Sequence, residues 1–425
     1  MPSSSPAFRR RAALAAAAAS LSSLAGCQTL DRLSGSPSRF RRHTRDAPVD
    51  GDRGPWPTTR GGFGRRSFAD RDLDVTATGR VDRLAPASRS QFPEQPAVGS
   101  HGVLALVSAL PSDVVGDGEG AFTGTLGVTT GGVRTLARRG VGSTVAAVGD
   151  AAILPGESGV VAVDARNGAE CWRFETGTFP TLVGDVCCLE AGDHLYGLDV
   201  RTGTVRWAVE NVADDDSYGY TVDAFAASDD RLFATRKHEY DAPSLVALDA
   251  RDGSVEWRGD VDRSGWPPVV GPDRVYVLSA SGTLTAFSLD GTREWARALD
   301  LAAPPAVGDD RLVATTASAP RSLVALDPAT GAELWRTPVA ADACAVPAVT
   351  PRRAYVTESG ARTPVSIAAI DVASGERRWT RSIPSTADDA GSLTASAPAL
   401  ADDGLVVAVV GNDAFASGRG TYLVA

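Results

Sequence analysis

The sequence has 425 residues, of which 43% are hydrophobic, with 44 glycines and 26 prolines. This mixture is typical of many short strands joined by tight turns. Acidic residues outnumber basic ones by 52 to 42, for a formal net charge of −10, so the folded domain should repel nucleic acid and anionic lipid, and both are excluded as its partners. Lys237 is the single lysine; an arginine-rich, acidic chain predicts a haloarchaeal source, with GC-rich codon bias alone as the alternative.

The first 26 residues are predicted to be an export signal. Arg9-Arg10-Arg11 precede an alanine- and leucine-rich run from Ala12 to Ala25, which is shorter than the ~20 residues that a membrane-spanning helix needs. Leu24-Ala25-Gly26-Cys27 resembles a lipobox in which Cys27 receives the lipid, and the arginines resemble a twin-arginine signal. We therefore predict a lipoprotein at the outer face of the cytoplasmic membrane; an uncleaved anchor helix is the alternative.

Residues 27–57 are expected to form a flexible tether. They are rich in Ser, Gly, Pro and Arg and show no apolar period. The folded domain is then predicted to span residues 58–425.

One pattern recurs six times in this domain. An apolar strand, in most copies ending in aspartate, is followed by a glycine and, four residues later, by a tryptophan. The aspartate can cap a turn and the glycine supplies positive φ, while each tryptophan can bury roughly 150–250 Å². We predict that the six indoles dock neighbouring sheets; they are Trp172, Trp207, Trp257, Trp295, Trp335 and Trp379. A degenerate seventh copy begins at Leu126.

A second element, an apolar hairpin with a polar turn, precedes each copy and occurs eight times, from Pro96-Ala97-Val98 to Ala399-Leu400-Ala401. Together the two elements make a four-stranded sheet of about 40 residues, which is the period of a propeller blade. The sequence therefore predicts an all-β fold, an eight-bladed β-propeller of four-stranded antiparallel blades.

The last blade is short of one strand in this count. Its third strand runs to Val424-Ala425, and no fourth strand follows. An open edge would expose backbone donors and acceptors, so a strand within Asp72–Pro86 is predicted to close the ring by pairing near Gly404–Val409 or Tyr422–Ala425.

The repeat resembles a known family. Its A-x-D-x-x-T-G-x-x-x-W pattern, matched best around Gly203 and Gly331, is similar to the PQQ-like, or tryptophan-docking, propeller repeat of quinoprotein alcohol dehydrogenases and BamB-like lipoproteins. The resemblance extends from about Trp56 to Ala425 and implies the fold more strongly than the function.

Catalytic chemistry has weak support in the sequence. In the quinoprotein dehydrogenases that the chain resembles, a vicinal disulfide lies against PQQ, and calcium completes the pocket. Cys187-Cys188 fits that pattern, but it falls in a predicted strand whose successive side chains point to opposite faces, so we predict two free, half-buried thiols. No haem motif, histidine ligand spacing or nucleophile elbow occurs. We predict no catalytic, cofactor-binding or metal residues; a small PQQ- and calcium-dependent dehydrogenase is the alternative.

Binding is expected on the face where the second turns and the blade-to-blade links emerge, because their lengths vary. Two neighbouring segments combine aromatic and charged side chains, which suits a contact patch; ordinary solvated loops and a calcium site at Asp214–Asp216 are the alternatives. The candidate partner patch comprises Asp215, Asp216, Tyr218, Tyr220, Lys237, His238, Glu239 and Tyr240. The sequence thus predicts a monomeric, non-catalytic scaffold that binds a protein or another surface partner.

Overall fold

The structure is a computed structural model that describes residues 40–41, most of 72–85, 97–99, 102–110, 122–129, 132–138, and most of 146–425. Within 146–425 the longest gaps are 211–220, 385–392 and 412–419. Every regular element among the described residues is a β-strand. No helix suited to crossing a bilayer occurs in this part of the chain.

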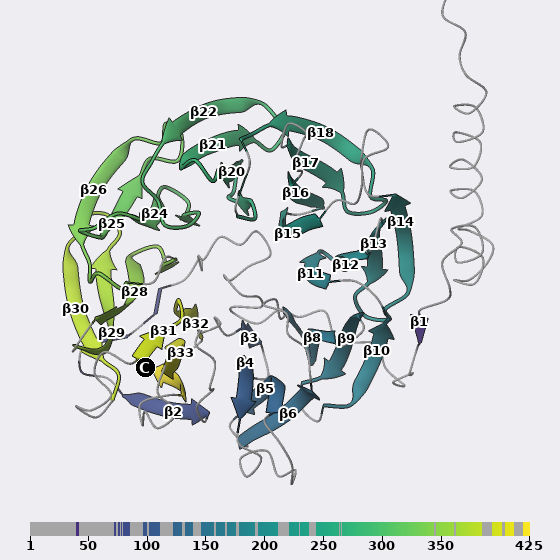
Figure 1. The fold of residues 1–425 in the computed structure, drawn as a ribbon, viewed down its shortest axis with the longest axis horizontal. Coiled ribbons are helices and arrows are strands. Elements are labelled where there is room, and N and C mark those ends of the chain that lie inside the picture. Colours follow the sequence, from purple (N-terminus) through teal and green to yellow (C-terminus); the bar gives the residue numbers. More distant parts are fainter. Residues whose placement is uncertain are drawn as a thin grey trace, which may run out of the picture.

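The described strands form eight sheets, which lie around a ring with their first strands toward the centre and their fourth strands on the rim (Figure 1). Neighbouring strands pair antiparallel throughout. The fold is therefore an all-β propeller.

The first four sheets follow chain order. The first contains β3 (Ala97–Gly99), β4 (Gly102–Leu110), β5 (Phe122–Thr129) and β6 (Gly132–Arg138). The second contains β7 (Ala146–Val148), β8 (Ala151–Gly156), β9 (Gly159–Asp164) and β10 (Glu170–Phe174), with β1 (Phe40–Arg41) at its outer edge. The third contains β11 (Thr178–Val183), β12 (Val186–Ala191), β13 (His194–Asp199) and β14 (Val205–Glu210). The fourth contains β15 (Thr221–Ser228), β16 (Arg231–Lys237), β17 (Ser244–Asp249) and β18 (Val255–Asp260).

The next three sheets repeat this plan. The fifth contains β19 (Val269–Val270), β20 (Arg274–Leu278), β21 (Thr283–Ser288) and β22 (Arg293–Ala298). The sixth contains β23 (Ala306–Val307), β24 (Leu312–Thr315), β25 (Ser322–Leu326) and β26 (Glu333–Pro338). The seventh contains β27 (Ala348–Val349), β28 (Arg353–Gly360), β29 (Thr363–Asp371) and β30 (Arg377–Ser382).

The eighth sheet combines strands from both sides of the sequence. It contains β31 (Leu393–Ala395), β32 (Ala399–Leu400), β33 (Leu405–Gly411), β34 (Gly420–Val424) and β2 (Val81–Ala85). β2 pairs antiparallel with β34, with Val81 opposite Val424, and Ala425 N donates to Arg80 O at 2.9 Å. A strand from within 72–86 thus takes the outer position of this sheet and satisfies the backbone groups along β34.

The core lies between the sheets rather than on one side of each. β25 is buried along its whole length, whereas β26 on the rim is largely exposed. Inner strands are covered on both faces because each sheet packs between two neighbours, and such strands are continuous runs of apolar residues. Six of the outer strands, β10, β14, β18, β22, β26 and β30, each carry one tryptophan.

Candidate functional site

The turn between the third and fourth strands is held by its aspartate. In the sixth sheet Asp327 Oδ1 accepts hydrogen bonds from Ala329 N at 3.0 Å, Thr330 N at 2.8 Å and Thr330 Oγ1 at 2.9 Å. Gly331, with φ of +67°, returns its N–H to Asp327 O at 2.8 Å. The hydrogen bond from the Thr330 side chain lowers the pKa of Asp327. The turn is thereby fixed with a main-chain carbonyl presented outward, just after the aspartate.

Five of the six predicted tryptophans bond to the carbonyl at this turn position in the next sheet; four of these carbonyls follow an aspartate and the fifth, Leu289 O, follows Ser288. The Nε1–O distances are between 2.8 and 3.1 Å, for Trp172 to Val200, Trp207 to Ala250, Trp257 to Leu289, Trp295 to Pro328 and Trp335 to Val372. The turn glycine lies on the indole: a Cβ added to Gly375 would stand 2.7 Å from Trp335 Cδ2. Positive φ and this close approach together require glycine.

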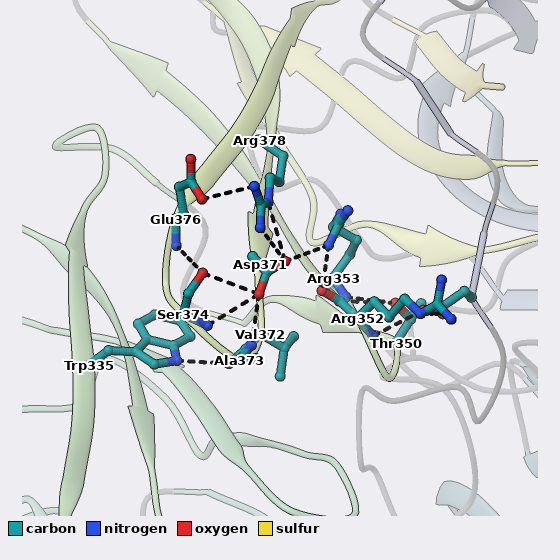
Figure 2. Close-up of polar contacts among 11 residues, drawn as sticks. Trp335, Thr350, Arg352, Arg353, Asp371, Val372, Ala373, Ser374, Glu376 and Arg378 are labelled. Atoms are coloured by element: carbon teal, nitrogen blue, oxygen red, sulfur yellow. Dashed lines mark hydrogen bonds and ion pairs between the residues drawn. The ribbon is translucent and has the colours of Figure 1, made fainter.

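Figure 2 shows one such contact, where Trp335 meets the turn of the seventh sheet. Asp371 caps that turn by accepting from Ala373 N and Ser374 N, at 3.1 and 3.2 Å. Its other oxygen accepts from the guanidinium groups of Arg353 and Arg378, both at 2.9 Å. The carboxylate therefore has a structural role in holding the turn.

The contact between the fifth and sixth sheets, called here the five–six junction, uses three donors. Trp295 Nε1 and Tyr276 Oη both donate to Pro328 O, at 3.1 and 3.4 Å, and Arg297 Nε donates to Thr330 O at 2.7 Å. The Tyr276 and Trp295 ring centroids lie 6.0 Å apart with an interplanar angle of 49°. An indole, a phenol and a guanidinium thus converge on one turn.

The contact between the seventh and eighth sheets, the seven–eight junction, carries the same three side-chain types. Tyr355 and Trp379 have ring centroids 6.0 Å apart and an angle of 46°, and Trp379 packs against the apolar cluster of the eighth sheet. Arg381, two residues after Trp379, takes the place of Arg297. The pair Tyr355–Trp379 is therefore the counterpart of Tyr276–Trp295.

The partners differ at this junction. Arg381 donates to Ala425 O at 2.9 and 3.0 Å and to Thr76 O at 3.0 Å. Tyr355 Oη is buried without a hydrogen-bond partner, and Trp379 Nε1 has no acceptor among the described residues. Val424 pairs with Leu405 as Leu326 pairs with Leu312, which places Ala425 at the position of the capping aspartate.

A cavity of about 360 Å³ lies beside Trp379 at this junction. Asp72 on its wall is held by Arg352, whose Nε lies 3.0 Å from Oδ2 and whose main-chain N donates to Oδ1 at 3.0 Å. Burial raises the pKa of Tyr355 to about 12, and the charges of Arg353 and Asp72 reach the same phenol. The cavity is lined by Asp72, Leu73, Val75, Thr76, Arg352, Arg353 and Trp379.

The family model described as outer membrane protein assembly factor BamB matches residues 123–217, 196–304 and 297–421. The chain belongs to this family of PQQ-like propeller repeats. No curated protein sequence matches the chain.

Solved structures of the same fold include both kinds of family member. BamB from Moraxella catarrhalis is 16% identical, with 81% of this chain and 98% of that chain covered and a TM-score of 0.50. Quinohemoprotein alcohol dehydrogenase from Comamonas testosteroni is 13% identical, with coverage of 97% and 84% and a TM-score of 0.59. A quinohemoprotein alcohol dehydrogenase from Pseudomonas putida is 12% identical, with coverage of 89% and 79% and a TM-score of 0.59. At these identities the likeness shows the fold.

The cysteine pair that suggested a quinone lies inside the third sheet of this family member. Cys187 and Cys188 are free, as predicted, but the prediction that they are half-buried is wrong: they are 0% and 1% exposed. Alternate side chains do point to opposite faces, yet both faces are covered by neighbouring sheets. Burial raises the pKa of both thiols, that of Cys187 to about 12. Two protonated thiols enclosed by apolar side chains do not fit a pair that contacts a cofactor.

The other predicted residues are distributed as follows. Cys27, Asp215, Asp216, Tyr218, Tyr220, His238, Glu239 and Tyr240 lie outside the described residues, and of Lys237 only the backbone position, at the end of β16, is described. No group of three or more His, Cys, Asp or Glu side chains suited to a metal ion occurs among the described residues.

Sequence reasoning missed the seven–eight junction as a site. Tyr355, Arg352 and Asp72 gave no signal, because Asp72 lies 280 residues from Arg352 in the sequence and meets it only in the folded ring.

Proposed function

We propose that the chain is a non-catalytic, extracytoplasmic, lipid-anchored β-propeller that acts as a monomeric protein-binding scaffold at the cell surface. The observation that carries the proposal is the chemistry of the cavity at the seven–eight junction. Its wall presents the guanidinium groups of Arg352 and Arg353 and the indole of Trp379 beside apolar side chains. The carboxylate of Asp72, the one acidic side chain among the described lining residues, is engaged by Arg352.

Such a wall suits recognition of an acceptor-rich surface. Arginine and tryptophan are enriched among the residues that dominate protein–protein binding energies. A general base is most often an imidazole or a carboxylate within reach of the proton that it takes, and the carboxylate described here, Asp72, is engaged in an ion pair. The matched family model is described as an assembly factor for outer membrane proteins, a description that also supports a protein partner.

Covalent crosslinking in intact source cells tests the scaffold role. The chain has 52 acidic residues but one lysine, so a carbodiimide joins its carboxylates mainly to the amines of other proteins and seldom to a second copy. We expect a discrete heterologous adduct after denaturing purification, identified by mass spectrometry. Recovery of the chain without any protein adduct would contradict the proposal.

The alternative of a PQQ-dependent dehydrogenase predicts a different result. Purified protein is mixed with PQQ and Ca²⁺, and visible absorbance, alcohol oxidation with an artificial electron acceptor, and the melting temperature are recorded. On the scaffold account none of the three changes. A bound-quinone spectrum together with alcohol oxidation would establish the dehydrogenase instead.

The membrane anchor has its own test. We expect Cys27→Ser to move the protein from the membrane fraction to the soluble fraction, because the predicted thioether-linked lipid is the main attachment that the sequence offers. A Cys27→Ser protein that stays in the membrane fraction would indicate an uncleaved helix or a protein tether.

A further inference from the structure

We propose that Trp266, together with Asp260 and Asp262, docks a basic, extended segment of another protein, with an arginine or lysine side chain over the indole. Trp266 lies in the four–five link, residues 261–268, which joins β18 to β19 and is described apart from residues 263 and 265. The proposal rests on the proposed scaffold function and adds a second contact surface, separate from the cavity at the seven–eight junction.

The first argument is the exposure of Trp266. Seven tryptophans lie among the described residues, and six of them are the docking tryptophans, which are buried or half-buried. Trp266 is 40% exposed. It belongs to a link rather than to a rim strand, so it takes no part in the docking of one sheet on the next. Tryptophan is enriched among the residues that dominate protein–protein binding energies, and this indole is accessible to a partner.

The second argument is how firmly the backbone of Trp266 is held. Ser264, which is 6% exposed, forms a single antiparallel bridge with Ser279, directly after β20. Ser264 Oγ accepts from Trp266 N at 3.1 Å and lies 2.5 Å from Trp266 O. From the fourth sheet, Thr235 Oγ1 donates to Trp266 O at 3.5 Å. Pro267-Pro268 follow, and a proline restricts the residue before it. Both neighbouring sheets thus position Trp266 in advance, which lowers the entropic cost of binding.

The third argument is the charge beside the indole. Carboxylates on three rim strands pair with an arginine: Glu256 with Arg231, Glu294 with Arg274, and Glu333 with Arg336. Asp260 and Asp262 are exposed, and neither has an ion-pair or hydrogen-bond partner in the described part of the chain. Asp262 precedes Trp266 by four residues, so their Cα atoms are at most about 14 Å apart. A short extended segment covers that length.

These features select a basic partner. The face of an indole carries negative electrostatic potential, and tryptophan is the aromatic side chain on which a guanidinium or ammonium group stacks best. A second basic side chain of the same segment would pair with Asp260 or Asp262. The formal net charge of −10 on the whole chain favours the same kind of partner at longer range and disfavours an acidic one.

A short arginine peptide, acetyl-(Arg-Gly)₄-amide, is the probe. It is titrated into the full-length protein while the indole N–H resonances are followed by nuclear magnetic resonance. We expect the Trp266 resonance to shift to saturation while the resonances of the six docking tryptophans stay in place. The same peptide with glutamate in place of arginine should leave the Trp266 resonance unchanged, because it lacks the cation that the indole and the carboxylates bind.

Matched variants locate the site, with affinity measured by fluorescence anisotropy of a dye-labelled arginine peptide. Trp266→Ala, and Asp260→Asn combined with Asp262→Asn, should each weaken binding about fivefold, the upper range for a cation on an exposed indole. Leu334→Ala removes another exposed apolar side chain, 45% exposed on β26, and Asp273→Asn removes an exposed carboxylate from the first turn of the fifth sheet. Both controls should leave the affinity unaltered. The two aspartate substitutions change only exposed side chains and therefore serve even where Trp266→Ala fails to fold.

Several outcomes would overturn the proposal. A Trp266 resonance that stays in place at millimolar peptide, or equal weakening by Asp273→Asn and by the two link aspartates, would show that the acidic chain binds the peptide without a defined site. In the carbodiimide crosslinking in source cells, we expect adducts in which Asp260 or Asp262 is joined to a lysine of the partner. Protein adducts formed only through other carboxylates would leave the scaffold function standing and overturn this docking site.

Discussion

The five–six and seven–eight junctions contain the same arrangement of tyrosine, tryptophan and arginine side chains with different occupants. At the five–six junction all three donate to the turn Asp327–Gly331 of the sixth sheet. At the seven–eight junction, within the described part of the chain, Arg381 donates to Ala425 O and Thr76 O, while Tyr355 Oη has no partner and Trp379 borders a cavity.

The difference shows which part of a docking contact the propeller needs for closure. The outer position of the eighth sheet is taken by β2, whose backbone pairs with β34, and the segment before it is fixed by Asp72 to Arg352. Strand pairing removes the open edge, and Arg381 holds the segment before β2 through Thr76 O. The ring is therefore closed here by main-chain pairing with a strand from the other end of the sequence.

The largest expected effect concerns the tryptophans themselves. Trp335→Ala should lower the free energy of unfolding by about 3–5 kcal/mol, as is usual for truncating a packed tryptophan. Trp379→Ala should cost at least about 1 kcal/mol less, because no hydrogen bond from its indole to a turn is lost. Denaturant unfolding of both variants measures the difference. Equal costs would mean that the seven–eight junction is as fully packed as the others.

The tyrosine pair should give effects of opposite sign. Tyr276→Phe should destabilise the protein by about 0.5–1 kcal/mol, because it removes the bond to Pro328 O. Tyr355→Phe should be neutral or stabilising by up to about 1–2 kcal/mol, because it removes a buried hydroxyl that has no partner. The comparison uses the same denaturant experiment, and a destabilised Tyr355→Phe protein would reveal a partner for that hydroxyl.

The smallest effect depends on pH. The hydrogen bond from Thr330 holds the pKa of Asp327 below its ordinary value of 3.8. The ionised Asp327 carboxylate therefore contributes to stability above about pH 4. This contribution is lost as the pH falls through the lowered pKa of the folded state. The Asp327→Asn protein should lose less stability between pH 5 and pH 3 than the wild type does. The melting temperatures of both proteins across this pH range measure the difference. An identical pH dependence would mean that this carboxylate does not stabilise its turn.

Much of this architecture could be predicted from residue spacing. The four-residue interval from Gly203 to Trp207 and its repeats is local information, and so is the apolar alternation of each hairpin. These patterns indicated the all-β propeller because each blade is assembled from sequence neighbours. The two-sided burial of Cys187 and Cys188 was missed because it depends on packing between sheets, which a single strand does not encode.

The candidate site was less accessible to the same reasoning. Asp72 and Arg352 are 280 residues apart in sequence, and no periodic pattern connects them. The lack of a partner for Tyr355 is likewise invisible in the sequence, where Tyr355 and Tyr276 occupy equivalent places in similar strands.

Hydrogen exchange of the tryptophan indole N–H groups tests the central claim most directly. Each indole resonance is assigned by a single Trp→Phe variant, and exchange is followed by nuclear magnetic resonance. The account predicts slow exchange for Trp172, Trp207, Trp257, Trp295 and Trp335, which donate to the next sheet, and faster exchange for Trp379, which borders a cavity. Exchange of Trp379 as slow as that of the other five would contradict it.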